Sequence, residues 1–184
     1  MAFVSPKRVL TKQKNTIIIR TGDMNDALGM HELTKDVLRE EKGLVMTIHD
    51  FTMTVEDQRI KNDWYVQLPK TLTLLAEDQK KIIGILTIEP EPFIKTAHRG
   101  NLGIIIHKDY RSEGVGNALM ETALQWVKSS KMYDKIQLEV LESNIRGIAL
   151  YEKLGFKIEG IIKNALKHAN NSYENIHIMG LQIQ

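Results

Sequence analysis

The chain has 184 residues, 42% of them hydrophobic and 26% charged, a composition typical of a soluble protein with one domain over residues 1–184. It contains no cysteine, which excludes disulfides, thiolate catalysis and cysteine-ligated zinc and fits a reducing cytoplasm. With 25 Lys+Arg against 23 Asp+Glu, it lacks the basic excess of a nucleic-acid-binding protein. No apolar run approaches the roughly 20 residues of a membrane span, and the N-terminus lacks the features of a secretion signal.

The first half predicts one strand, two helices and a strand pair. Residues 1–15 are locally basic and are expected to form a loosely ordered extension. The β-branched run "TIIIR", Thr16 to Arg20, predicts the first strand. Apolar residues then recur at helical spacing from about 26 to 46, and a second helix is predicted after the capping residue Thr54. The segments "TLTLLAE" and "KIIGILTIE" are joined by a polar turn and predict a hairpin.

The second half predicts strands that alternate with helices. The apolar run "NLGIII" indicates a strand covered on both faces, and a helix is predicted over 114–129. The alternating "KIQLEVL" predicts a half-buried strand. A short helix follows over 145–154, with Gly155 as its left-handed cap. Two closing strands, "FKIEGII" and "IHIMGLQI", are separated by the polar stretch 163–174. This order implies an α/β layered sheet, mostly antiparallel early and with strand–helix crossovers late.

The loop "DYRSEGVGNAL" lies between a strand and a helix and is a candidate anion site. The first N–H groups of a helix have no internal partner and carry partial positive charge. Gly114 and Gly116 would let the backbone approach a pyrophosphate, and Arg111 carries a planar donor fork suited to phosphate oxygens. On this motif alone a purely structural turn stays open. The spacings of a P-loop and of a dinucleotide fingerprint are both missing.

Together with "LEVLESNIRGIALYEKLGF", this loop resembles the paired motifs of the GNAT superfamily of acetyl-CoA-dependent N-acetyltransferases. The resemblance runs in register from about His98 to Leu181, and the order of elements extends it to Thr16. It is nearest to the bacterial ribosomal-protein alanine acetyltransferases and the amine and amino-acid acetyltransferases. It implies a GNAT-type acyl-CoA acyltransferase fold, with a mixed central sheet of about seven strands flanked by about four helices.

The resemblance also implies a site for acetyl-CoA. Backbone groups of Ile104 to Ile106 would pair with the pantetheine arm, and the loop from Arg111 to Gly116 would hold the pyrophosphate through main-chain N–H groups. Glu113 departs from the family pattern, but an exposed carboxylate that points away would cost little because water screens it. The implied cofactor-binding residues are Ile104, Ile105, Ile106, Arg111, Ser112, Glu113, Gly114, Val115, Gly116, Asn117, Asn144, Ala149, Tyr151 and Lys153.

Acetyl transfer to an amine needs a base for the amine and an acid for the leaving thiolate. Tyr151 matches the family tyrosine that protonates the thiolate; the alternative is an aromatic packed in the core. Glu139, in "LEVLESN", matches the glutamate assigned as base in the ribosomal-protein alanine acetyltransferases; the alternative is a solvated carboxylate. Asn144 matches a family asparagine that contacts cofactor or water, and it also suits an N-cap.

The remaining residues of note have structural interpretations. The histidines lack metal-ligand spacing, so no metal is expected, and Trp64, Tyr65 and Trp126 are expected to anchor the core. The predicted activity is transfer of acetyl to a primary amine by direct attack in a ternary complex. A non-catalytic acyl-CoA sensor is the alternative, and a homodimer is left open. Residues 24–66 and 163–174 are expected to select the acceptor.

Overall fold

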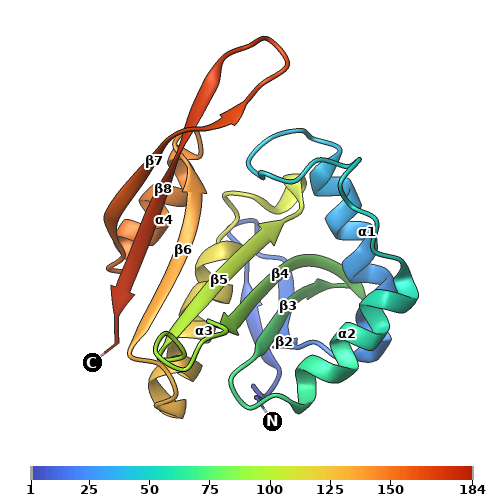
Figure 1. Cartoon of the computed structure of the whole chain (residues 1–184). Coiled ribbons are helices and arrows are strands. Elements are labelled where there is room, and N and C mark those ends of the chain that lie inside the picture. The colour runs from blue at the N-terminus through green and yellow to red at the C-terminus, as the bar shows by residue number, and fades with distance from the viewer. Residues whose placement is uncertain (1, 184) are drawn as a thin grey trace.

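A computed structural model describes residues 2–183 and contains one eight-stranded sheet, in the order β1-β2-β3-β4-β5-β6-β8-β7 (Figure 1). The strands are β1 (Lys7–Leu10), β2 (Thr16–Thr21), β3 (Leu72–Asp78), β4 (Lys81–Pro90), β5 (Arg99–Ile106), β6 (Lys135–Leu141), β7 (Lys157–Lys167) and β8 (Tyr173–Gln182). The α-helices are α1 (Ala27–Leu38), α2 (Val55–Gln67), α3 (Val115–Ser130) and α4 (Ile145–Lys153), with short 3₁₀ helices η1 (Met24–Asp26) and η2 (Lys108–Tyr110). The predicted mixed α/β sheet with four helices is confirmed.

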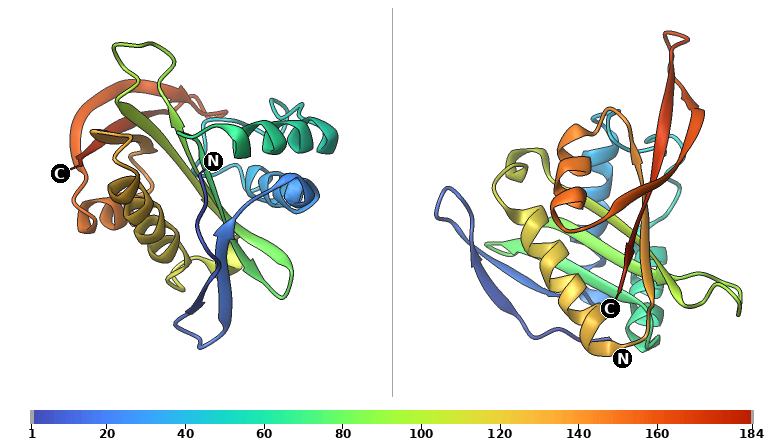
Figure 2. Two further views of the ribbon diagram at one scale, coloured as in Figure 1. Left: turned by 90° about the horizontal axis from the view of Figure 1, so that it is seen from below. Right: turned by 90° about the vertical axis from the view of Figure 1, so that its left-hand side faces the viewer.

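The helices cover the two faces of the sheet in pairs. Helices α1 and α2 lie on one face, and α3 and α4 lie on the other (Figure 2). The larger core cluster joins the central strands to α3, with Leu119, Met120 and Ile136 fully buried. A smaller cluster lies under α1 and includes Leu33 and Ile105. Successive apolar residues of the central strands point to opposite faces, so both faces of the sheet are buried.

The N-terminal segment differs from the prediction. Residues 7–10 form β1, which pairs antiparallel with β2 in register from Lys7 opposite Ile19 to Leu10 opposite Thr16. Ala2 is buried in the larger core cluster, and Val4 and Val9 pack against it. These apolar contacts and the four-residue ladder order a segment whose local composition alone is typical of a frayed terminus. This strand accounts for the difference between the predicted seven strands and the observed eight.

Two element boundaries and the burial of one tryptophan also depart from the prediction. Helix α1 ends at Leu38 instead of about residue 46, and positive φ angles at Glu41 and Gly43 turn the chain after it. The β7–β8 hairpin extends into the predicted polar stretch, because polar strand residues face solvent at a sheet edge. Trp64 is 57% exposed instead of anchoring the core, whereas Trp126 is buried as predicted.

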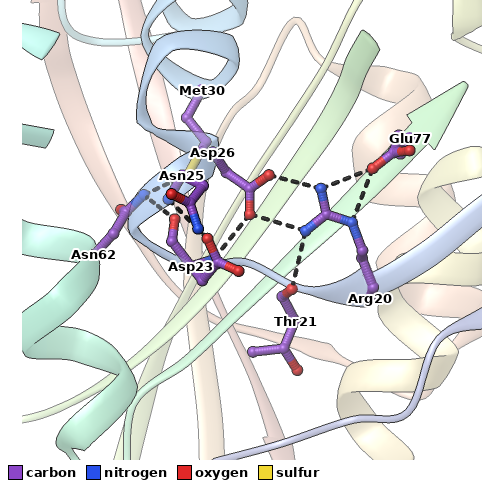
Figure 3. A network of polar contacts seen from close by, with 8 residues as sticks. All are labelled: Arg20, Thr21, Asp23, Asn25, Asp26, Met30, Asn62 and Glu77. Atoms are coloured by element: carbon purple, nitrogen blue, oxygen red, sulfur yellow. Dashed lines mark hydrogen bonds and ion pairs between the residues drawn. The ribbon is translucent and has the colours of Figure 1, made fainter. Parts of the chain in front are cut away.

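The start of α1 is fixed by a polar network around Arg20 (Figure 3). The Arg20 guanidinium donates to both carboxylate oxygens of Asp26, at 2.6 and 2.8 Å, and to Glu77 of β3 at 2.8 Å. These hydrogen bonds, chiefly that to Asp26, raise the pKa of Arg20 despite its burial. From α2, Asn62 donates to the Asp23 carbonyl at 2.8 Å. The network ties α1 and α2 to the sheet and so sets the position of the segment between them.

Candidate active site

Strands β5 and β6 are hydrogen-bonded over a short stretch only. They are the one parallel pair in the described sheet, and their ladder has three pairs, from Arg99 opposite Lys135 to Asn101 opposite Gln137. Beyond these pairs the two strands diverge (Figure 1). A gap therefore opens in the middle of the sheet, between Leu102–Ile106 on one side and Leu138–Leu141 on the other.

The edge of β5 that faces this gap has no strand partner beyond Asn101, and of its main-chain groups the Ile106 carbonyl accepts from Arg111 Nε at 3.0 Å. Ile105 lies opposite Ile85 of β4, and the His107 N–H donates to the Ile83 carbonyl of β4 at 2.9 Å. Because backbone groups alternate in direction along a strand, those of Ile104 and Ile106 face the gap. Of the predicted pantetheine-binding residues, Ile104 and Ile106 thus present their backbone to the gap, whereas Ile105 pairs with β4 and packs its side chain under α1.

The predicted pyrophosphate loop joins η2 to the N-terminus of α3. Ser112 and Gly114 both have left-handed backbones, with φ angles of 67° and 91°, and Gly114 is the N-cap. The Ala118 N–H makes the first bond within the helix, to the Gly114 carbonyl at 3.0 Å. The N–H groups of Val115, Gly116 and Asn117 precede that bond and lie at the positive end of the helix dipole. The loop has the geometry of an anion site.

Gly116 has ordinary helical backbone angles, and its lack of a side chain allows close packing. A Cβ atom at this position would lie 3.0 Å from Ile106 Cδ1 and 3.3 Å from Leu150 Cδ2. The first turn of α3 therefore lies close to both the end of β5 and α4. This close approach brings the three free N–H groups next to the mouth of the gap.

The two charged side chains of the loop point away from its N–H groups. Arg111 donates to both carboxylate oxygens of Glu40 at 2.6 and 2.8 Å, and its Nε donates to the Ile106 carbonyl at 3.0 Å. Glu113 is held by the β1–β2 turn, where the Gln13 backbone and side chain donate to its two carboxylate oxygens at 3.1 and 3.2 Å. The Glu113 carboxylate thus points away from the proposed pyrophosphate site, so it would repel a bound phosphate only weakly. The predicted donor fork of Arg111 is engaged by Glu40.

Helix α4 provides the remaining predicted cofactor residues. Asn144 is the N-cap and accepts from the Gly147 N–H at 3.0 Å, which confirms its capping role. Tyr151 is 7% exposed and packs in the core beside Phe156. Burial raises the pKa of Tyr151 to about 12, so its phenol stays protonated at neutral pH. Ala149 and Lys153 are exposed on the same helix.

Glu139 lies on the opposite face of β6 from the core side chains of that strand. Ile136, Leu138 and Val140 point into the core beside α3, so Gln137 and Glu139 point to the α1/α2 face. Glu139 is exposed, and it and the buried Tyr151 lie on opposite faces of the sheet, with β6 between them.

A row of polar side chains next to Glu139 is not predicted by the sequence patterns. Gln137 donates to Asn101 at 2.7 Å and to Glu91 at 2.9 Å, and Asn101 also donates to Glu91 at 2.8 Å. Alternation in "KIQLEVL" places Gln137 beside Glu139 on one face, but only the β5–β6 register brings Glu91 and Asn101 to it. These side chains lie on the same face of the sheet as Glu139.

The histidines have separate surroundings. His107 caps η2, and His168 contacts Glu174 at 2.9 Å. His98 is exposed, and the Nδ1 of His177 is buried with no partner among the described residues. Within residues 2–183, no group of three or more His, Asp or Glu side chains is arranged to hold a metal ion. No helix in that range is long and apolar enough to cross a membrane.

Comparisons with known proteins agree with this geometry. The Acetyltransferase (GNAT) family profile matches residues 36–156. The L-amino acid N-acetyltransferase AaaT of Escherichia coli is 31% identical over 112 residues, which cover 60% of this chain and 68% of that protein. The N-alpha-acetyltransferase of Saccharolobus solfataricus is 33% identical over 72 residues, covering 39% and 43% of the two chains.

Solved structures share the whole fold. A GNAT-family acetyltransferase from Streptococcus pneumoniae superposes with a TM-score of 0.86 at 28% identity, covering 91% of this chain and 99% of that one. A protein from Salmonella typhimurium, solved with its cofactor acetyl-CoA, gives a TM-score of 0.81 at 15% identity, covering 91% and 94%. The second likeness concerns the fold alone.

Proposed function

The chain belongs to the GNAT family of acetyltransferases and is an acetyl-CoA-dependent N-acetyltransferase, and we propose that it transfers acetyl to a primary amine by direct attack in a ternary complex. The observation that carries this proposal is the open edge of β5 beside the free N–H groups of α3. An extended pantetheine arm can add to such an edge as a strand does, and a pyrophosphate suits such a helix start.

The proposed cofactor site depends on main-chain groups. Main-chain groups of Ile104 and the N–H of Ile106 would bind the pantetheine amides, because the Ile106 carbonyl already accepts from Arg111. The N–H groups of Val115, Gly116 and Asn117 would bind the pyrophosphate. The residues fit this group for two reasons. The β5 edge has no strand partner beside the gap, and the acidic side chain of the loop, Glu113, points away from the N–H groups and is bound by Gln13. With the arm in the gap, its thiol end would lie between the two faces of the sheet.

The chemistry would then be divided between the two faces. Glu139 accepts a proton from the incoming ammonium, directly or through water, so that the free amine attacks the thioester carbon. The nitrogen of the tetrahedral intermediate releases its second proton to water, and the C–S bond breaks as the intermediate collapses. Tyr151 donates its phenolic proton to the departing thiolate and regains a proton from solvent. Burial raises the pKa of Tyr151 to about 12, so the phenol is protonated at neutral pH and has a proton to donate.

The absence of cysteine favours direct attack. The chain has no thiol to carry an acetyl group between donor and acceptor. Both substrates would therefore be bound together, the donor in the gap and the amine on the α1/α2 face beside Glu139.

The acceptor class proposed is a primary amine, either of a small molecule, of an amino acid or of a protein N-terminus. Relatives named for L-amino acid and for N-alpha acetylation support an α-amine in particular. The polar row of Glu91, Asn101 and Gln137 offers hydrogen-bonding groups to such a substrate.

A thiol-release assay with acetyl-CoA tests this proposal. The panel should contain alkyl amines, free amino acids and short peptides, with each peptide matched by its N-acetylated form as a control. We expect release with at least one free amine, none with the blocked partner, and intersecting initial-velocity lines. Parallel lines would contradict the ternary complex. Tight CoA binding without turnover on any amine would instead support an acyl-CoA sensor.

A further inference from the structure

The side chain of Arg111 connects the proposed pyrophosphate loop to the segment that follows α1. Its partner Glu40 follows the end of α1 and begins the α1–α2 segment, residues 39–54, which arches over the C-terminal end of β5 (Figure 1). The pair is bidentate at 2.6 and 2.8 Å, and the Glu40 side chain is only 19% exposed. Paired, partly buried charges of this geometry are held more firmly than a surface ion pair.

Arg111 makes its third contact at the mouth of the gap. Its Nε donates to the Ile106 carbonyl at 3.0 Å. A trans peptide points its N–H and C=O in opposite directions, and the His107 N–H points to β4. The Ile106 carbonyl therefore faces the gap, and Arg111 bridges that open edge to Glu40.

The far end of the α1–α2 segment is held separately. His31 of α1 contacts the Met53 carbonyl through Nε2 at 3.0 Å, and its ring lies beside Phe51. Between these two attachments, Val45 and Met46 are exposed. The segment is thus attached at one end to its own helix and at the other to the cofactor loop, and Leu44 between them packs against the cluster under α1. Its exposed apolar residues lie on the α1/α2 side, where the acceptor is proposed to bind.

We propose that Arg111 is a positioning residue that acts through Glu40 and couples CoA binding to the ordering of the α1–α2 segment. This inference rests on the proposed CoA site. CoA fixes the loop, the Arg111–Glu40 pair transmits that constraint to residue 40, and the acceptor side is organised once the donor is bound. Coupling of this kind is reciprocal, so an ordered segment also strengthens CoA binding.

Glu40→Gln separates this role from direct phosphate binding. If Arg111 were a phosphate ligand, removing Glu40 would free its guanidinium and delete a nearby negative charge, so CoA would bind more tightly. If the pair positions the loop, CoA binding should weaken by about five- to tenfold, the lower part of the range usual for coupled sites. Arg111→Lys keeps the charge but loses the two parallel bonds, and it should weaken CoA binding in the same direction.

Two measurements on the full chain test the proposal, with CoA itself as the probe. Calorimetry gives the affinity, and hydrogen exchange reports whether CoA protects residues 39–54. We expect protection in the wild type and its loss in Glu40→Gln. Asp36→Asn is the matched control, because it removes the carboxylate of an exposed pair with Arg39 from the same helix and should change neither result. Melting temperatures check that every variant is folded.

The outcomes are distinct. Unchanged or tighter CoA binding by Glu40→Gln, with protection of 39–54 retained, would overturn the coupling and leave the CoA site intact. A wild-type chain that does not bind CoA would overturn the proposed function together with this inference. If Glu40→Gln is too unstable to assay, Arg111→Lys decides by hydrogen exchange at saturating CoA: protection of 39–54 retained there would overturn the coupling, and its loss would support it.

Discussion

The two faces of the sheet present different chemical groups beside the gap: mainly main-chain groups on one face and polar side chains on the other. On the α3/α4 face the proposed site consists of main-chain N–H groups, a left-handed glycine and one buried phenol. On the α1/α2 face it consists of polar side chains, Glu91, Asn101, Gln137 and Glu139, which contact one another or solvent. Main-chain sites depend on local backbone geometry, whereas side-chain surfaces can change residue by residue. The donor side is therefore constrained by the fold, and the acceptor side is open to variation.

The largest expected effect concerns the buried phenol. Tyr151→Phe removes the proton donor but keeps the ring that fills the core, so turnover should fall by about 10²- to 10⁴-fold while CoA affinity stays the same. Thiol release and calorimetry measure the two quantities. Tyr133→Phe is the control, because Tyr133 is also buried and its hydroxyl donates to the Lys70 carbonyl. A turnover loss equal to that of the control would remove Tyr151 from the chemistry.

The next effect belongs to the opposite face. Glu139→Gln removes the proposed base, and turnover should fall by about 10²-fold near neutral pH. The deficit should grow as the pH falls, because less of the acceptor amine is then unprotonated and more depends on the base. Glu91→Gln is the comparison on the same face: it alters the proposed acceptor surface, so it should change KM for the amine and leave the pH dependence of turnover unchanged. If the pH–rate profile changes with Glu91 and not with Glu139, the base is assigned to the wrong carboxylate.

The same division explains what the sequence could predict. The loop "YRSEGVG" and "NIRGIALYEKLGF" are local patterns, so the positions of Gly114, Asn144 and Tyr151 follow from neighbouring residues. The partners of Arg111 and Glu113 do not, because Glu40 and Gln13 are 71 and 100 residues away. The row at Glu91 depends on the β5–β6 register. Long-range contacts of this kind leave no periodic signal in the chain.

A smaller effect tests the main-chain character of the donor side. Gly114→Ala places a Cβ on a backbone with a φ of 91°, a strain of about 1–2 kcal/mol for a non-glycine residue. If the loop relaxes to relieve it, CoA affinity should fall by about tenfold. Gly155→Ala carries the same strain at a φ of 93°, just after the C-terminal end of α4 and outside the loop. Both should lower the melting temperature, and only Gly114→Ala should weaken CoA binding.

The smallest effect lies where the β7–β8 hairpin meets the start of α4. Burial favours the protonated form of Glu174, but hydrogen bonds from the Ser143 N–H at 3.0 Å and from His168 at 2.9 Å outweigh it and lower the pKa of Glu174. A lowered pKa in the folded state stabilises the protein above the ordinary value of 4.5 and loses that contribution as the pH falls. The ionised carboxylate thus ties the acceptor-side hairpin to the helix that carries Tyr151.

Glu174→Gln should therefore lower the free energy of unfolding by about 1 kcal/mol at neutral pH, as expected for charged hydrogen bonds partly screened by water. Urea unfolding at about pH 7 and about pH 4 measures it, and the difference from wild type should shrink at the lower pH because the wild-type carboxyl is then becoming protonated. Glu152→Gln, an exposed carboxylate on α4, is the control. A difference that stays constant with pH would show that Glu174 acts through packing instead of charge. The charge of Glu174 would then not connect the β7–β8 hairpin to the helix that carries Tyr151.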